Sequence, residues 1–104
     1  MTAYTDAPIT ITITGGSLTG ATDVHVTFKQ PFATVDVTDA EVLDANNLQL
    51  TLTQEQTGAL KMDKSCDCQV NWLDGNGKRK ATNITTIPVL ANLLERIIRR
   101  SGNG

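Results

Sequence analysis

Strict alternation of apolar and polar residues is the feature that most constrains the fold of this chain. The stretch PITITIT, from Pro8 to Thr14, places Ile9, Ile11 and Ile13 on one side of an extended backbone and threonines on the other. Successive side chains of a β-strand point to opposite faces, so this period of two predicts a half-buried strand. The stretches DVHVTFK, ATVDV and LQLTLT repeat the period, with expected inward residues Val24, Val26, Phe28, Val35, Val37, Leu48, Leu50 and Leu52.

The spacing of turn signals sets the expected fold class. Gly15-Gly16, Asn46-Asn47 and Gly75-Asn76-Gly77 separate the alternating stretches, and Pro31 and Pro88 end strands. About six or seven short strands with turns every ~8–12 residues predict a mainly β, antiparallel sandwich or barrel. The sequence leaves the facing of the return strand from Lys80 to Pro88 open, because Ile84 and Ile87 have opposite parity; a bulge between them would reconcile the two.

Two segments depart from the period of two. Thr53, followed three residues later by Gln56, has the form of a capping box, which predicts one short helical turn at about Gln54 to Leu60. The segment VLANLLERIIRR predicts a C-terminal amphipathic helix over about residues 89–100. Its apolar residues, at the i, i+3, i+4, i+7, i+8 spacing, are Leu90, Leu93, Leu94, Ile97 and Ile98.

The predicted C-terminal helix leaves two interpretations open. Its apolar stripe either closes an open end of the sandwich or binds a partner or another subunit, which makes its five apolar residues the candidate partner-contact site. Arg96, Arg99 and Arg100 lie toward its end, where cations are favoured by the helix dipole. Residues 101–104, Ser-Gly-Asn-Gly, are expected to form a disordered tail.

Length and charge narrow the classes of function. The 104 residues fit one domain, taken here as residues 1–100. The net charge is −2, but residues 1–60 hold one base against seven acids and residues 61–104 hold eight bases against four acids. The sequence shows no charged-then-apolar N-terminal segment and no apolar run near the ~20 residues of a membrane helix. We therefore expect synthesis in the cytoplasm and no membrane partner.

Cys66 and Cys68 lie one residue apart before the single tryptophan of the chain, Trp72. On a strand they share a face with Val70 and Trp72, and this face is the natural core row because free cysteine packs as a small hydrophobe. A structural zinc site needs four ligands, whereas this chain has no further cysteine and a single histidine. The sequence therefore predicts a packing role, with no metal and no cofactor.

The remaining chemistry-bearing residues are interpreted as surface. His25 lies on the face opposite to Val24 and Val26, among ordinary polar neighbours. Asp36 is grouped with Asp39 in the loop region before Glu41, as a solvated acid. No catalytic residue, cofactor-binding residue or small-molecule substrate is expected.

The stretch GNGKRK supports an alternative function. Its glycines belong to a turn between two strands, unlike a phosphate loop, which precedes a helix. Nucleic-acid contact through one basic region is the alternative hypothesis, with candidate residues Lys78, Arg79, Lys80, Arg96, Arg99 and Arg100. The acidic balance and the four aromatic residues argue against it.

The stretches LTLTQEQTGAL and VNWLDGNGKRKATNITTIPV, with the LL that follows, carry a family resemblance over about Val24 to Leu94. They resemble short phage and prophage proteins of Gram-positive bacteria that are encoded among virion structural genes. They are also similar to the N-terminal immunoglobulin-like domain of phage baseplate upper proteins. The matched fold positions are Leu52, Thr53, Gln54, Glu55, Trp72, Gly77 and Lys78.

The resemblance implies an immunoglobulin-like β-sandwich and a non-enzymatic role. The expected function is that of a virion or virion-assembly protein of the tail, baseplate or head–tail region. The expected partners are other phage structural proteins or further copies of the chain. The expected location is the host bacterial cytoplasm when the protein is made, and the virion if it is a structural component.

Overall fold

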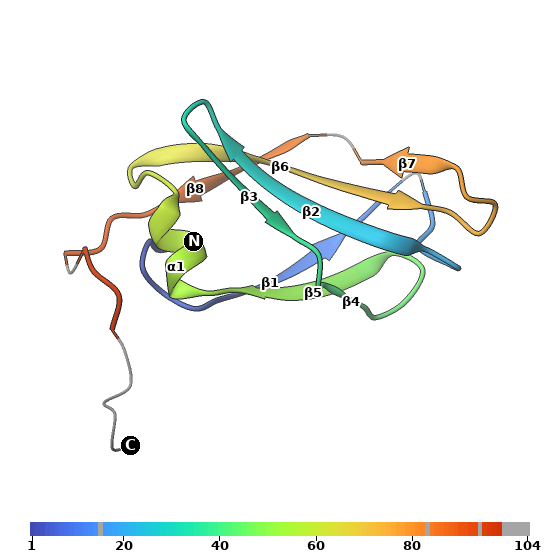
Figure 1. Cartoon of the computed structure of the whole chain (residues 1–104), viewed down its shortest axis with the longest axis horizontal. Coiled ribbons are helices and arrows are strands. Elements are labelled where there is room, and N and C mark those ends of the chain that lie inside the picture. The colour runs from blue at the N-terminus through green and yellow to red at the C-terminus, as the bar shows by residue number, and fades with distance from the viewer. Residues whose placement is uncertain (15, 83, 94, 99–104) are drawn as a thin grey trace, which may run out of the picture.

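The computed structural model of the chain describes residues 1–14, 16–82, 84–93 and 95–98 (Figure 1). These residues form eight strands and one helix, α1 (Gln54–Ala59). The strands are β1 (Ala7–Thr12), β2 (Thr22–Gln30), β3 (Ala33–Val37), β4 (Glu41–Val42), β5 (Asn47–Leu52), β6 (Lys64–Leu73), β7 (Arg79–Ala81) and β8 (Thr85–Val89). The expected mainly β, antiparallel class is confirmed.

The strands form two antiparallel sheets that lie as two layers (Figure 1). One sheet has the order β1-β5-β4. The other has the order β3-β2-β6-β7, and β8 pairs with β6 as well. The pairs β1–β5 and β2–β6 join segments far apart in the sequence. The connections from β1 to β2, from β3 to β4 and from β5 to β6 cross from one sheet to the other.

The core lies between the two sheets and consists of the residues that the alternation places inward. In the larger sheet, Val26 pairs with Val37 on one side and with Val70 on the other, and all three are buried. In the smaller sheet, Leu48, Leu50 and Leu52 are buried. One buried cluster contains side chains from both sheets, so each sheet covers the apolar face of the other.

The capping box predicted for the short helical turn is present. The Thr53 side chain accepts a hydrogen bond from the Gln56 backbone, and the Gln56 side chain accepts one from the Thr53 backbone. These contacts satisfy two N–H groups that the first turn of a helix leaves without partners. The helix is therefore confirmed at the expected place, between β5 and β6.

The return strand is two strands, not one. β7 and β8 both pair with β6, and Thr82 lies between them. The Thr82 backbone N–H donates to the Val70 carbonyl (2.9 Å), and its hydroxyl accepts from the Val70 N–H (3.1 Å). The hydroxyl thus replaces one bond of the ladder. This irregularity resolves the parity conflict, since Ile84 is exposed while Ile87 is half-buried.

The C-terminal helix is a correction to the sequence prediction. In the described part of residues 89–100, Val89 ends β8 and no residue is helical. Leu90 instead forms a parallel bridge with Thr2: its N–H donates to the Met1 carbonyl and its carbonyl accepts from the Ala3 N–H. Residues 94, 99 and 100 of the predicted helix, and the predicted tail 101–104, lie outside the described residues.

The physical reason for this difference is packing. An amphipathic helix of this length is stable in water mainly when its apolar face packs against another surface. Leu93 is 103% exposed and Ile98 is 64% exposed, so no apolar surface of the described chain covers that stripe. The backbone groups near Leu90 are already bonded to the N-terminal segment, and an extended path results.

Among the described residues, no helix is long and apolar enough to cross a membrane.

Candidate functional site

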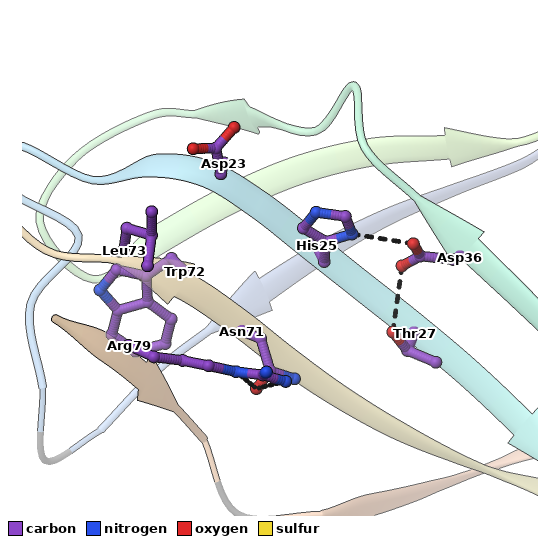
Figure 2. A pocket seen from close by; sticks show the side chains of 8 residues that line it. All are labelled: Asp23, His25, Thr27, Asp36, Asn71, Trp72, Leu73 and Arg79. Atoms are coloured by element: carbon purple, nitrogen blue, oxygen red, sulfur yellow. Dashed lines mark hydrogen bonds and ion pairs between the residues drawn. The ribbon is translucent and has the colours of Figure 1, made fainter. Parts of the chain in front are cut away.

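A polar cleft opens on the outer face of the larger sheet, at the end where β2, β3, β6 and β7 meet (Figure 2). Its volume is about 380 Å³. The strand alternation that buries valines and cysteines inward turns the polar residues of β2 and β3 to this side. The lining residues are Asp23, His25, Thr27, Asp36, Asn71, Trp72, Leu73 and Arg79.

His25 and Asp36 form the central contact of the cleft. Thr27 on β2 is directly opposite Asp36 on β3, and His25 is the next residue on the same face of β2. The His25 Nδ1 atom lies 2.8 Å from Asp36 Oδ2, and the Thr27 hydroxyl donates to Asp36 Oδ1 at 3.1 Å (Figure 2). Asp36 therefore binds both neighbours at once. The His25 and Asp36 side chains are 45% and 44% exposed, so solvent screens their attraction.

A second contact lies across β6. His25 is in register with Asn71, and Arg79 on β7 reaches back to the same asparagine. The Arg79 Nε and Nη2 atoms donate to Asn71 Oδ1 at 3.3 and 3.2 Å. This arrangement holds the guanidinium against the Asn71 side chain (Figure 2).

A β-bulge shapes the end of the cleft. Thr22 pairs with Leu73 and His25 with Asn71, so Asp23 and Val24 together lie opposite the single residue Trp72. Asp23 has φ +51°, a left-handed conformation that aspartate adopts more readily than most residues. Bulges bend a strand and redirect side chains, and this one places the Asp23 carboxylate at the rim (Figure 2).

Trp72 closes the base of this region. It is 4% exposed, and its Nε1–H finds no hydrogen-bond partner among the described residues. The far edge of the indole ring lies beneath Gly16, where an added Cβ would be 3.7 Å from the ring. A side chain at position 16 would thus lie directly against Trp72.

The chemistry offered by the cleft is hydrogen bonding, with both donors and acceptors. A nucleophile–histidine pair needs a hydroxyl or thiol at the second imidazole nitrogen. Here the Thr27 hydroxyl bonds to Asp36 instead of His25. Within the described chain, no group of three histidine, cysteine or acidic residues is placed to hold a metal ion.

The sequence interpretation missed the contact between His25 and Asp36 because it assigned Asp36 to a loop. The structure corrects this, since Asp36 is the fourth residue of β3. A usable signal was present: the ATVDV alternation that turns Val35 and Val37 inward turns Asp36 outward. A two-residue turn at Pro31-Phe32 then sets the register that brings Asp36 beside Thr27 and His25.

The predicted packing role of the two cysteines is confirmed. Cys66 and Cys68 are free thiols, 1% and 4% exposed, in the same inward row as Val70 and Trp72. Burial raises the pKa of both thiols, and the pKa of Cys68 rises to about 11. The thiolate is the form of cysteine that reacts as a nucleophile and binds metals. These thiols stay protonated near neutral pH, so they are poorly suited to redox chemistry or metal binding.

The predicted partner-contact residues lie at the surface of an extended segment. Leu90, Leu93 and Ile98 are exposed, Ile97 is half-buried, and Leu94 lies outside the described residues. The segment is held by its own polar groups. The Asn92 side chain donates to the Ala3 carbonyl (3.0 Å), and the Ile98 N–H donates to the Gln54 side chain (2.8 Å).

The structure separates the predicted basic residues. Arg79 points into the polar cleft, whereas Lys80 lines a different hollow beside Gly16 and Asp74. The hairpin that carries them is at the opposite end of the molecule from the C-terminal segment with Arg96 (Figure 1). Arg99 and Arg100 lie outside the described residues.

An acidic residue also lies within the basic turn. Asp74 Oδ1 accepts hydrogen bonds from the backbone N–H groups of Asn76 and Lys78, both at 2.9 Å. The bond from Lys78 lowers the pKa of Asp74 most, and the bond from Asn76 and the charge of Lys80 lower it further. The carboxylate therefore stays ionised and offsets part of the positive charge of the turn.

Comparisons of the chain with protein-family models, with curated proteins and with solved structures find no match.

Proposed function

We propose that this chain is a non-enzymatic protein of a phage or prophage, a virion component or an assembly factor of the tail, baseplate or head–tail region. It acts through protein–protein contact and is made in the host bacterial cytoplasm; as a virion component, rather than an assembly factor, it would be located in the virion. The observation that carries the contact role is the exposed apolar C-terminal segment. The resemblance in the turn after β5 and in the β6–β7 hairpin carries the phage assignment.

An immunoglobulin-like sandwich is part of this proposal, and the strand order supports it. Immunoglobulin domains place strands A, B, E and D in one sheet and C, F and G in the other, and the variable type adds C′ beyond C. The order β1-β5-β4 corresponds to B-E-D, and β3-β2-β6-β8 corresponds to C′-C-F-G. Among the described residues, strand A has no counterpart beside β1.

The C-terminal apolar face is defined here as Leu90, Leu93, Ile97 and Ile98. Three of these side chains are more than half exposed, while polar contacts to Ala3 and Gln54 hold the backbone of the segment in place. Exposed apolar clusters on soluble domains commonly mark protein-binding surfaces. A partner gains apolar burial here without first having to order a free chain end.

The test uses particles purified from cells that carry the phage genes. We expect mass spectrometry to detect the wild-type chain in the particle fraction. A Leu93→Asp variant should be lost from that fraction while keeping its circular dichroism and tryptophan fluorescence, because Leu93 makes no core contact. Leu43→Asp is the matched control, an exposed leucine (48%) far from the C-terminal face, and should be retained.

Two outcomes contradict the proposal. Absence of the wild-type chain from the particles and from assembly intermediates would contradict the virion role. Equal incorporation of Leu93→Asp and the wild type would contradict the C-terminal apolar face as the contact surface. Nucleic-acid binding is not favoured by the structure, because Arg79 and Lys80 of the hairpin line different hollows.

A further inference from the structure

The outer edge of β1 is open over the whole strand. β1 is the end strand of the smaller sheet, and its only strand partner among the described residues is β5. An unpaired edge presents a row of backbone N–H and carbonyl groups that another strand can bind. The other end strand of this sheet, β4, is only two residues long, so β1 is the longer free edge of the sheet.

The register of β1 identifies the groups that face outward. The Ile13 N–H donates to the Asn46 carbonyl, in line with the pairing of Ile11 with Leu48 and of Ile9 with Leu50. In an antiparallel pair, alternate residues direct their backbone groups to opposite sides. The backbone groups of Pro8, Thr10 and Thr12 therefore point away from β5, and no hydrogen bond of the described residues reaches them. Proline has no N–H, so the free donors are those of Thr10 and Thr12.

The chemistry of this edge differs from that of a protected edge strand. Monomeric proteins commonly place charged residues on exposed edges. β1 has the sequence APITIT, which carries no charge. Pro8 blocks strand pairing only at the start of this edge. Ile9 and Ile11 are half-buried, whereas the inward leucines of the neighbouring β5 are buried.

A hollow of about 100 Å³ lies beside this edge, between β1 and the larger sheet. Ile11 and Thr12 line one side, and Val70 and Thr85 line the other. Among the described residues, no charged side chain lines it. The hollow accepts small apolar side chains, as an added strand would supply at alternate positions.

We propose that β1 pairs with β1 of a second copy of this chain, antiparallel and about a two-fold axis at Ile11. In this register Thr10 faces Thr12 of the second copy, and the same pair recurs across the axis. Each pair exchanges two N–H···O bonds, so all four free N–H groups of the two edges gain an acceptor. On the inward side, Ile11 faces Ile11 of the second copy, and Ile9 faces Ile13 of the second copy.

The self-complementarity of the sequence singles out a second copy as the occupant. The register puts isoleucine against isoleucine inside and threonine against threonine outside, and both kinds of cross-strand pair are favourable. It brings no like charges together, and Pro8 lies outside the four bonds. The product is one continuous sheet across two protomers with an isologous interface.

The experiment compares the wild type with Thr10→Pro and Thr10→Ala by sedimentation equilibrium. Proline at position 10 removes one outward N–H per protomer, hence two of the four bonds, and leaves the β1–β5 ladder intact. We expect it to weaken dimerisation at least about tenfold, whereas alanine keeps the N–H and changes it less than about threefold. The Thr10 and Thr12 amides should gain protection from hydrogen exchange as the wild-type concentration rises.

Three results would overturn the proposal. The first is a wild type that stays monomeric at millimolar concentration with rapidly exchanging Thr10 and Thr12 amides. The second is a dimer that Thr10→Pro leaves unchanged. The third is a pair of amides that gain protection only when another protein is added. Because this pairing does not use the C-terminal apolar face, Leu93→Asp should not affect it, and the two proposals fail independently.

Discussion

At the scale of single residues, polar side chains inside the core join separate parts of the chain. Thr57 is fully buried on α1, and its hydroxyl donates to the Thr5 carbonyl (2.8 Å) and accepts from the Thr5 N–H (2.9 Å). Gln30 is 2% exposed, and its amide makes the equivalent pair of bonds with the Lys61 backbone. Each side chain satisfies backbone groups that no strand partner reaches.

Replacing Thr57 by valine, which keeps the shape and removes the hydroxyl, should lower the free energy of unfolding by about 1–3 kcal/mol. The reason is that the Thr5 N–H and carbonyl lose their partner at a half-buried position. Thr57→Ser is the matched control, because it keeps the hydroxyl and loses one methyl group, at a cost of about 0.8 kcal/mol. Urea denaturation measures both, and a Thr57→Val variant as stable as the wild type would contradict the role of the hydroxyl.

The Cys68 thiol predicts a loss of stability at alkaline pH. Burial, and to a lesser extent Cys66, raises its pKa from the ordinary value of 9.0 to about 11 in the folded protein. Below pH 9 the thiol is protonated in both the folded and the unfolded state, so its contribution to the free energy of unfolding is fully present. Between pH 9 and pH 11 only the unfolded state loses the proton, and the free energy of unfolding falls.

Denaturant titrations from pH 8 to pH 11 on the wild type and on Cys68→Ala test this effect. Other groups titrate in the same range, so the comparison is between slopes and not between absolute stabilities. The wild type should lose more stability per pH unit than the variant. Equal slopes would contradict the prediction, because they would show that the pKa of the Cys68 thiol is the same in the folded and the unfolded chain.

At the scale of elements, the position of α1 depends on the N-terminal segment packed against it. Tyr4, with φ +58°, places its ring over Gly58. An added Cβ at position 58 would be 2.6 Å from two ring carbons, well inside van der Waals contact. The Tyr4 ring occupies the space that a side chain at position 58 would need. This explains a glycine within the helix, although glycine is a poor helix former.

Gly58→Ala tests this packing, because the two effects of the substitution have opposite signs. Alanine favours the helix by roughly 0.5–1 kcal/mol, but displacing the Tyr4 ring costs about 1–3 kcal/mol. We expect a net loss of about 1 kcal/mol in thermal or chemical denaturation. In a Tyr4→Ala background the same substitution should become stabilising, and a stabilising effect in the wild-type background would contradict the contact.

At the scale of the whole molecule, the two sheets are stable only together. The smaller sheet has one apolar face, formed by β1 and β5, and the larger sheet covers it. Trp72 lies in this shared core and is the single tryptophan of the chain. Its fluorescence therefore reports the separation of the two sheets.

We expect one cooperative unfolding transition, because a small domain with a single shared core has no part that can remain folded alone. The midpoints in urea by tryptophan fluorescence and by far-ultraviolet circular dichroism should coincide. The fluorescence should shift to longer wavelength as Trp72 enters water. Two separated midpoints would show that the sheets unfold independently.

The candidate cleft was predictable only in part. The alternation placed His25 and Thr27 on the outer face, as the structure confirms. The bulge at Asp23 and the contact of Arg79 with Asn71 carry no local sequence signal, because both depend on the pairing of β2, β6 and β7. The position of Asp36 required knowing that the turn before β3 has two residues.

The sequence by itself determined the properties that repeat over a few residues. The period of two identified the strands and their buried faces, including the row of Cys66, Cys68, Val70 and Trp72, and the capping box located α1. Only the tertiary structure decided which strands pair, because pairing joins residues far apart in the chain. It also decided the path after Val89. The apolar residues at helical spacing have no apolar surface of the described chain to pack against, and the backbone of Leu90 bonds to the N-terminal segment instead.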